Sequence, residues 1–299
     1  MATDQLGTRH QLEKFGNRWS GAPTSVRAVH VLDLGSLQID GSVMSYGLGL
    51  ASVEDQARPA DWVTIPLYAV LVETSDARIL FDTGTHPDSK SRWAESLQPY
   101  EYLVASEEQF LPQRLDAIGL RPEDVDIAVL SHLHMDHSGA IEFLTNAEVF
   151  VHRDELRNAL EHYARIDGSP AYVKEDVAAW IKAGVKWAPI DQSEGDLKIA
   201  PGVTVLNFGP GHTDGDLGLM IEMPDSGLLI LAGDACYNSV NLGPPTVLPG
   251  SNALADSQGL MRTAHRLRRL IAEEGATVWF GHDPEQYSKL VKAPTGFYA

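Results

Sequence analysis

The chain has 299 residues, 43% of them hydrophobic and 21% charged, a composition typical of a globular protein long enough to bury a large core. Its formal net charge of −18 repels polyphosphates and anionic lipids. That charge argues against nucleic acid and membranes as partners, and it favours a neutral or cationic substrate or a shielded site. No apolar run is long enough to span a bilayer, and the single cysteine, Cys236, fits a reducing compartment.

The first part of the chain predicts an N-terminal arm followed by strands. Residues 1–25 are polar and lack the apolar stretch of a secretory signal, so we expect a loose arm and a cytoplasmic protein. A strand is expected over Val26–Leu34, and residues 35–62 are expected to form a long connecting loop, which at that length is usually functional or disordered. Ile65–Glu73 and Arg78–Phe81 flank a short turn and predict a hairpin.

The rest of the chain alternates short apolar strands with helices. Ser106 and Gln109 form a capping box, which predicts a helix through about Ile118 that ends at Gly119. A buried strand is expected at Asp126–Leu130. Further strands are expected at Glu148–His152, Val203–Phe208, Leu217–Glu222, Leu228–Leu231 and Thr277–Phe280, and further helices at Asp154–Tyr163, Lys174–Ala183 and Ser257–Glu274. Because no linker separates the two halves, we expect one domain, residues 26–299, with two packed sheets covered by helices.

The most specific motif directly follows the buried strand that ends at Leu130. Residues 131–139 read SHLHMDHSG. His132 and His134 are two positions apart, so on extended backbone both imidazoles point to the same side. Asp136 and His137 follow at once. Nitrogen and oxygen donors so close together suit Zn²⁺ or a similar dication, and a histidine-rich surface loop is the weaker interpretation.

Three further polar residues stand at the exits of later strands, each beside a glycine that lets the backbone approach closely. They are His212, Asp234 and His282. Each alone is more often an ordinary loop residue, but with the histidine cluster they predict convergence on one site. The donor types favour zinc and leave cobalt, manganese and iron open.

This succession of residues resembles the metallo-beta-lactamase superfamily from about Val26 to the C-terminus. The resemblance implies an α/β (α+β) fold, an αββα sandwich, with two divalent metal ions at one edge of the two sheets. It also implies the ligand sets, which are His132, His134 and His212 for the first metal, Asp136, His137 and His282 for the second, and Asp234 as the bridge.

Within that superfamily the chain is more similar to the N-acyl homoserine lactonases, which are quorum-quenching enzymes. The supporting stretches are IPLYAVLV (65–72), ILFDTG (79–84), RWAES (92–96), LNFGPGH (206–212) and WFGHD (279–283). Tyr237 matches a tyrosine that these enzymes place beside the substrate carbonyl, although a tyrosine after an apolar strand is more often a core residue. Asp82 is a candidate for orienting a metal-bound imidazole, or else a turn-forming residue.

The ligand set and the resemblance together predict a lactone hydrolase. A hydroxide shared by two metals about 3.5–4 Å apart is expected to attack the lactone carbonyl. Tyr237 would stabilise the oxyanion and Asp136 would carry a proton to the leaving oxygen. The expected substrate is a small neutral amphiphilic lactone. Candidates for binding its acyl chain, with core packing as the alternative role, are Met44, Tyr46, Leu48 and Trp93. The resemblance also suggests a homodimer.

Other functions use a similar centre. A different lactone, a thioester or a small ester remains open because substrate choice resides in loops. Relatives of glyoxalase II carry an additional basic C-terminal helical region, whereas only a short segment follows His282. The missing signal disfavours a secreted beta-lactamase, and the charge disfavours an RNase Z-like nuclease. A non-hydrolytic metal or redox protein of the flavodi-iron kind usually has Glu at the position of His134 and an added flavin domain.

Overall fold

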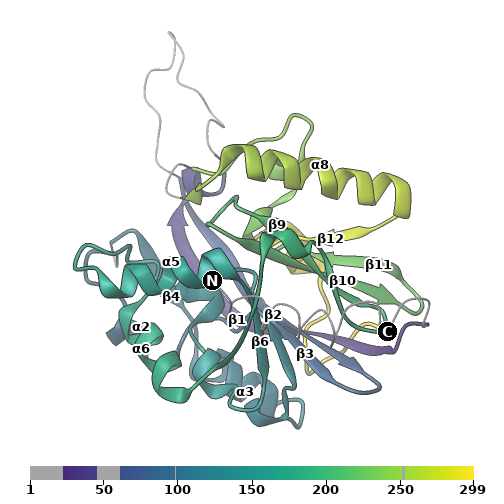
Figure 1. Cartoon of the computed structure of the whole chain (residues 1–299), viewed down its shortest axis with the longest axis horizontal. Coiled ribbons are helices and arrows are strands. Elements are labelled where there is room, and N and C mark those ends of the chain that lie inside the picture. The colour runs from purple at the N-terminus through teal and green to yellow at the C-terminus, as the bar shows by residue number, and fades with distance from the viewer. Residues whose placement is uncertain (1–22, 46–60, 98, 251–252) are drawn as a thin grey trace, which may run out of the picture.

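Two β-sheets packed face to face form the centre of the computed structural model, which describes residues 23–45, 61–97, 99–250 and 253–299 (Figure 1). The first sheet has seven strands, in the order β4 (Glu101–Val104), β1 (Val26–Asp40), β2 (Trp62–Thr74), β3 (Arg78–Phe81), β5 (Ile127–Val129), β6 (Glu148–His152) and β7 (Lys186–Ile190). The second has five, in the order β12 (Thr277–Trp279), β11 (Gly227–Leu231), β10 (Asp216–Met223), β9 (Val203–Gly209) and β8 (Leu197–Ala200).

Strand direction brings several strand ends to the same edge of each sheet. In the first sheet β3, β5, β6 and β7 pair in parallel, so the carboxyl ends of β3 and β5 lie together. In the second sheet β10 pairs antiparallel with both β9 and β11, and β12 runs parallel to β11. The carboxyl ends of β9, β11 and β12 therefore share one edge, where polar loop residues can meet.

Helices cover the outer face of each sheet. The described helices are α2 (Ser89–Arg92), α3 (Leu111–Asp116), α4 (Met135–Ser138), α5 (Arg153–Ala164), α6 (Lys174–Ala183), α7 (Ser239–Leu242), α8 (Ser257–Glu274) and α9 (Pro284–Lys289). In Figure 1, α8 lies over the second sheet, while α3, α5 and α6 lie on the other side of the molecule, against the first. The buried positions of α8 include Leu260, Ala264 and Leu267, which are three or four residues apart and so form one apolar stripe.

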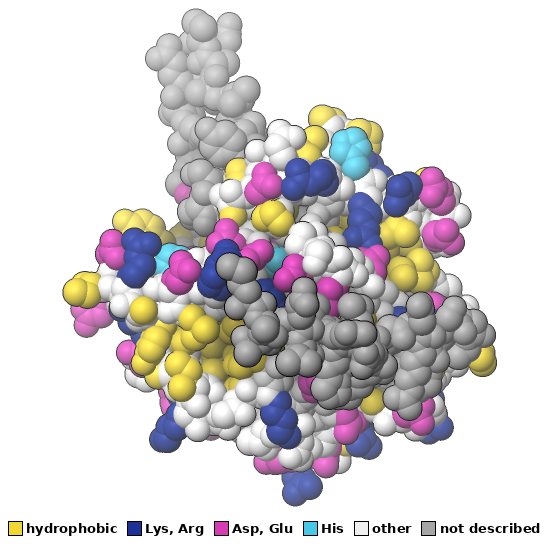
Figure 2. Space-filling view, in the orientation of Figure 1, with side chains coloured by type: hydrophobic (Ala, Val, Ile, Leu, Met, Phe, Trp, Pro, Cys, Tyr) yellow, Lys and Arg dark blue, Asp and Glu magenta, His cyan; other side chains and the backbone are white. Residues whose placement is uncertain are grey.

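Apolar side chains fill the three spaces between these four layers. Val31, Val70 and Phe81 of the first sheet pack with Val205 and Leu219 of the second. Separate clusters lie between the first sheet and its helices and between the second sheet and α8. The predicted αββα sandwich is confirmed. On the face drawn in Figure 2, acidic side chains lie interspersed with Lys and Arg, so the acidic excess is not gathered into one patch there.

Most of the predicted strands and helices are present, but the loop predicted over residues 35–62 is partly wrong. β1 continues through Gly35, which has a φ of +93° at an irregularity in the β1–β2 register, and runs to Asp40. Trp62 begins β2. Pairing of residues 36–39 with both β2 and β4 supplies the hydrogen bonds that extend the strand. Residues 46–60 lie outside the described residues.

The helix predicted from Ser106 to Ile118 is also wrong in extent. Ser106 and Gln109 do hydrogen-bond, the Ser106 N–H donating to Gln109 Oε1 over 3.0 Å, but they cap only a 3₁₀ turn. Phe110 is extended, and the α-helix begins at Leu111 with Pro112 in its first turn. A proline ring clashes with the carbonyl four residues earlier, which stops one helix from running through both parts. The sequence pattern also missed β4, β7 and β8, which are short strands of four or five residues.

The structure describes only the last residues of the predicted N-terminal arm. Of the predicted arm at residues 1–25, residues 1–22 lie outside the described residues, while Thr24 and Ser25 hydrogen-bond the carbonyl oxygens of Glu222 and Pro201. Among the described residues, no helix is long and apolar enough to cross a membrane.

Candidate metal centre and active site

The two sheet edges bring five side chains from beyond strand ends and two side chains of a short helix into a single cluster. His132 and His134 follow β5, and Asp136 and His137 lie on the short helix α4. His212 follows β9, Asp234 lies in a 3₁₀ turn after β11, and His282 follows β12. Their donor atoms form three overlapping groups in which all atoms lie within 4.8 Å of one another. These groups are His132–His134–His212, His132–His137–Asp234 and Asp136–His137–His282.

Asp234 stands between two sets of imidazoles. Its Oδ2 lies 3.9 Å from His132 Nε2 and 3.5 Å from His212 Nε2. Its Oδ1 lies 3.3 Å from His137 Nε2 and 3.1 Å from His282 Nε2. Each carboxylate oxygen therefore faces a different set, which is the arrangement that a bridging ligand requires.

The remaining donors complete the two sets. His134 Nδ1 lies 3.0 Å from His212 Nε2. On the other side, Asp136 Oδ2 lies 3.5 Å from His137 Nε2 and 3.6 Å from His282 Nε2. One set therefore offers three imidazoles, and the other offers two imidazoles and a carboxylate.

Hydrogen bonds behind the imidazoles fix which nitrogen faces the centre. His282 Nδ1 lies 2.9 Å from the Pro66 carbonyl oxygen, and His212 Nδ1 lies 3.0 Å from that of Ala253. A carbonyl oxygen only accepts, so these Nδ1 atoms carry a proton, and Nε2 is the ring nitrogen turned toward the centre.

Asp82 holds the histidine motif from behind. Its Oδ2 lies 2.9 Å from His137 Nδ1, and its Oδ1 accepts a 2.7 Å hydrogen bond from the Ser131 N–H. Asp82 is also the one non-glycine with a positive φ, +59°, among the described residues. Such a conformation is costly unless the surroundings impose it, and it is common at functional sites. The Asp82 carboxylate thus lies directly against an imidazole of the cluster.

Glycine permits the close approach of two strand exits. A Cβ on Gly281 would lie 2.5 Å from Asp234 Oδ1 and 2.8 Å from the Gly233 carbonyl oxygen. The turn before His282 can therefore pass Asp234 only because residue 281 has no side chain.

The donor set fits a pair of cations. His132 Nε2 and Asp234 Oδ1 are buried without a hydrogen-bond partner among the described residues, a state that costs free energy unless another group satisfies them. Burial and neighbouring imidazoles hold the pKa of His132 well below its usual range, and burial lowers that of His134 to about 3. Neutral imidazoles are the form that binds a metal.

The carboxylate side of the centre favours positive charge. Burial opposes the protonation of His137, but the carboxylates of Asp234, Asp136 and Asp82 outweigh it and raise the His137 pKa well above its usual range. Burial likewise opposes the ionisation of Asp136, yet His137 and His282 lower its pKa to about 2. Ionised carboxylates among imidazoles provide the negative charge that divalent cations require.

A cavity opens beside this cluster, and Tyr237 lies on its wall. The Tyr237 hydroxyl lies 3.4 Å from His212 Nδ1, and its ring stacks on His282 with centroids 5.4 Å apart. Four apolar residues from β1, β2 and the turn after β1 also line the cavity, namely Leu37, Ile39, Val43 and Ile65. The site therefore joins metal-type donors to an apolar wall.

The four residues predicted for the acyl chain have different positions. Met44 is 6% exposed and Trp93 is 5% exposed, and both pack in the core between the first sheet and its helices. Trp93 lines a second cavity and does not line the metal cavity; Glu101 lines both. Tyr46 and Leu48 lie outside the described residues.

Buried carboxylates that sequence reasoning missed support the cluster. Glu155 on α5 accepts a 2.9 Å hydrogen bond from the N–H of Leu133, between the first two histidines. Asp216 accepts a 2.7 Å hydrogen bond from the N–H of His212. Glu101 lines the metal cavity, and burial raises its pKa to about 7. A Glu or Asp carries no local sequence signal for such roles, because its partners come from distant elements.

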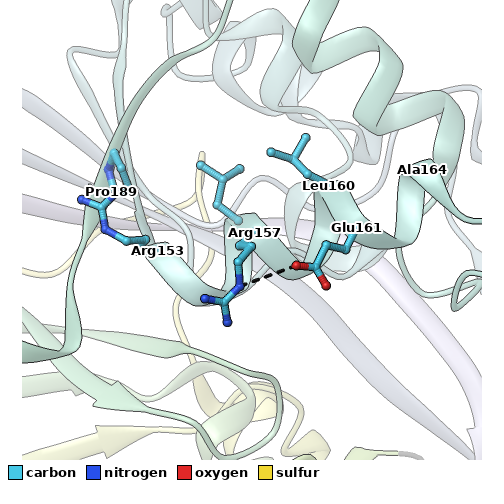
Figure 3. Close-up of a pocket in the computed structure, with 7 residues that line it drawn as sticks. Arg153, Arg157, Leu160, Glu161, Ala164 and Pro189 are labelled. Atoms are coloured by element: carbon cyan, nitrogen blue, oxygen red, sulfur yellow. Dashed lines mark ion pairs between the residues drawn. The ribbon is translucent and has the colours of Figure 1, made fainter. Parts of the chain in front are cut away.

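A further hollow lies on the surface at α5 and β7, away from the cluster (Figure 3). It is lined by Arg153, Leu156, Arg157, Leu160, Glu161, Ala164 and Pro189, and includes none of the seven donors. Arg157 Nε lies 3.8 Å from Glu161 Oε1, the ion pair drawn in Figure 3. This hollow offers no chemistry comparable to the donor cluster.

The chain matches one known protein family over most of its length. The chain belongs to the metallo-beta-lactamase superfamily, whose family model matches residues 65–282. Its relatives within the superfamily include N-acyl homoserine lactonases. It is 35% identical over 271 residues to N-acyl homoserine lactonase AiiB of Agrobacterium fabrum, covering 90% of this chain and 98% of that protein. It is 32% identical over 248 residues to an N-acyl homoserine lactonase of Bacillus cereus, covering 80% and 90%.

A solved structure shows the same fold. An N-acyl homoserine lactone hydrolase, described with the product N-hexanoyl-L-homoserine bound at its catalytic metal centre, superposes with a TM-score of 0.74 and 24% identity. The match covers 91% of this chain and 99% of that one. At this identity the likeness concerns the fold alone.

Proposed function

We propose that this chain hydrolyses the lactone ring of N-acyl homoserine lactones at a centre of two divalent cations. The observation that carries the proposal is the cluster of seven donors, in which the two oxygens of Asp234 face separate sets of side chains. Similarity to relatives that are N-acyl homoserine lactonases supports the choice of substrate.

Under this proposal the seven donors divide into two ligand sets. His132, His134 and His212 would hold the first cation, Asp136, His137 and His282 would hold the second, and Asp234 would contribute to both sets. Mixed imidazole and carboxylate donors suit zinc, which we propose as the metal. When bound, such cations supply an activated water at neutral pH and polarise the substrate carbonyl.

The chain's own side chains orient the substrate and move the proton. The Tyr237 hydroxyl, beside His212, donates a hydrogen bond to the carbonyl oxygen as negative charge develops there. Asp136, which lines the cavity and has a side chain 12% exposed, carries a proton from the attacking water to the ring oxygen. Water adds to the carbonyl carbon, the ring C–O bond breaks, and N-acyl homoserine is released with a proton.

The apolar wall excludes water and contacts the substrate. Leu37, Ile39 and Ile65 face the same cavity as the donors, and burying the apolar parts of an amphiphilic substrate there contributes about 25 cal/mol per Å². A neutral substrate also agrees with the net charge of −18, which would slow the approach of anions.

The experiment is a substrate panel on metal-replete protein. N-acyl homoserine lactones of short to long acyl chain, alkyl γ-lactones and thioesters are assayed by proton release, with bound metal measured in parallel. We expect ring opening of the acyl homoserine lactones by a colourless, zinc-loaded protein. Metal-replete protein that opens none of these lactones would overturn the proposal. Iron with visible absorbance would favour a redox role instead.

The catalytic domain over residues 26–299, the homodimer and the cytoplasmic location stay predictions. Size-exclusion chromatography with light scattering tests the dimer directly.

A further inference from the structure

One acidic side chain lies on the wall of the metal cavity without belonging to any donor group. Glu101 lines the cavity together with Asp136, Tyr237 and His282, but it is absent from the three groups of donor atoms. Within the described parts of the chain, no hydrogen bond or ion pair ends on its carboxylate.

The strand register shows that Glu101 points inward. β4 is the edge strand of the first sheet and pairs antiparallel with β1, with Glu101 opposite Ile39 and Leu103 opposite Leu37. Residues directly opposite each other share a face of the sheet, and Leu37 and Ile39 both line the metal cavity. Glu101 is thus an acid on an otherwise apolar inner face.

The outward residues of the same strand support this orientation. Tyr102 and Val104 are 55% and 43% exposed, while Leu103 is 5% exposed. Because side chains alternate along a strand, the inward positions of β4 are those of Glu101 and Leu103. A carboxylate placed on that face costs free energy unless a partner satisfies it.

Glu101 also borders a second, adjoining cavity. This cavity is lined by Lys90, Trp93, Glu101, Tyr102 and Leu103. Glu101 therefore stands between the metal donors on one side and, on the other, a surface formed by Trp93, Tyr102 and Leu103 together with Lys90. In an N-acyl homoserine lactone the amide N–H likewise stands between the lactone ring and the acyl chain.

We propose that the Glu101 carboxylate accepts a hydrogen bond from the amide N–H of the substrate and so selects lactones that carry an acylamino group. This inference rests on the proposed lactonase function. With the lactone carbonyl at the donor cluster, the amide nitrogen is attached to the neighbouring ring carbon, and the acyl chain continues toward Trp93. A lactone without the N–H leaves the carboxylate unpaired, which is how a polar site rejects an apolar analogue.

The test compares two substrates in the wild type and three variants. N-acyl homoserine lactone and an alkyl γ-lactone of equal chain length are assayed with wild type, Glu101→Leu and Glu101→Gln. Glu107→Leu, at an exposed glutamate beyond the end of β4, serves as the matched control. We expect Glu101→Leu to lower kcat/KM for the acylamino lactone at least tenfold and for the alkyl lactone less than about twofold. Glu101→Gln keeps an acceptor oxygen and should lose less.

A purely structural role for Glu101 makes a different prediction. Inward charges on edge strands also deter pairing with other chains, and loss of such a role would lower activity on both substrates equally. An equal loss on both substrates, or no loss on either, overturns the proposal. If Glu101→Leu fails to fold, the wild type is assayed with the acylamino lactone and with its N-methylated analogue, which lacks the amide N–H. A preference of less than tenfold in kcat/KM for the N–H form also overturns the proposal. The proposed function fails separately, if wild type opens neither lactone.

Discussion

At the scale of single residues, the centre depends on side chains that each satisfy two partners. Asp234 divides its two oxygens between two sets of imidazoles, and Asp82 divides its oxygens between the Ser131 N–H and His137. A substitution that removes one carboxylate oxygen from such a residue keeps the contacts of the other oxygen and breaks those of the oxygen that is lost. Single substitutions can therefore separate metal binding from chemistry.

Asp234→Asn replaces one carboxylate oxygen by an NH2 group, which cannot bind a cation. We expect bound metal to fall to one ion or fewer per chain, and kcat to drop more than about a hundredfold. Elemental analysis and lactone turnover measure both effects. Asp225→Asn, at an exposed turn residue, should change neither, and undiminished turnover by the Asp234 variant would reject its bridging role.

Tyr237→Phe removes the hydroxyl near His212 and keeps the ring that stacks on His282. Because one preorganised donor to the developing oxyanion is lost, kcat should fall by about tenfold to a hundredfold with bound metal unchanged. Steady-state kinetics and metal analysis check the pair of outcomes. Loss of metal in this variant would show that Tyr237 supports the centre structurally instead.

At the scale of elements, α5 supports the histidine motif through one buried carboxylate. Glu155 is fully buried and accepts hydrogen bonds from the Leu133 N–H over 2.9 Å and from the Tyr172 hydroxyl over 3.0 Å. The Tyr172 ring packs edge-on against His134 with centroids 5.1 Å apart. The position of the motif after β5 thus depends on a helix that follows the next strand.

Stability should depend on pH through Glu155. Burial raises its pKa from 4.5 to about 7, so between these values the folded protein binds more protons than the unfolded chain, and the Glu155 contribution to stability falls as pH rises. The loss across this window is up to about 3 kcal/mol. In urea unfolding between about pH 5 and 8, the free energy of unfolding should decline more steeply with pH for wild type than for Glu155→Gln. Parallel pH profiles for the two proteins would contradict a raised Glu155 pKa.

At the scale of the whole molecule, the metal site lies where both sheets end. Cations bound there connect the loops after β5, β9, β11 and β12, which belong to two different sheets. Ligands that bind only the folded state stabilise it by mass action. The centre should therefore contribute to the stability of the whole sandwich.

Removal of the metal should lower the melting temperature. An ion present at about a thousandfold over its Kd contributes about 4 kcal/mol, which corresponds to a decrease in Tm of about 6 °C for a chain of this size. Scanning calorimetry before and after chelation, with zinc added back as the control, measures it. An unchanged Tm after complete removal of bound metal would show that the two sheets do not depend on the centre.

The sequence alone determined the parts of this protein whose signals are local. Apolar strands ending in His132, His212, Asp234 and His282 predicted both the sandwich and the convergence of these residues, because strand ends meet at sheet edges. The structure brings those side chains together.

Only the tertiary structure decided the features that depend on partners distant in sequence. β1 extends past Gly35 because β2 and β4 pair with it, and Pro112 separates a 3₁₀ turn from α3. Glu101 becomes part of the cavity through its pairing with Ile39, and Glu155 supports Leu133 from another helix. Cross-strand pairs and buried hydrogen bonds join residues by position in space, and no local pattern in the chain encodes them.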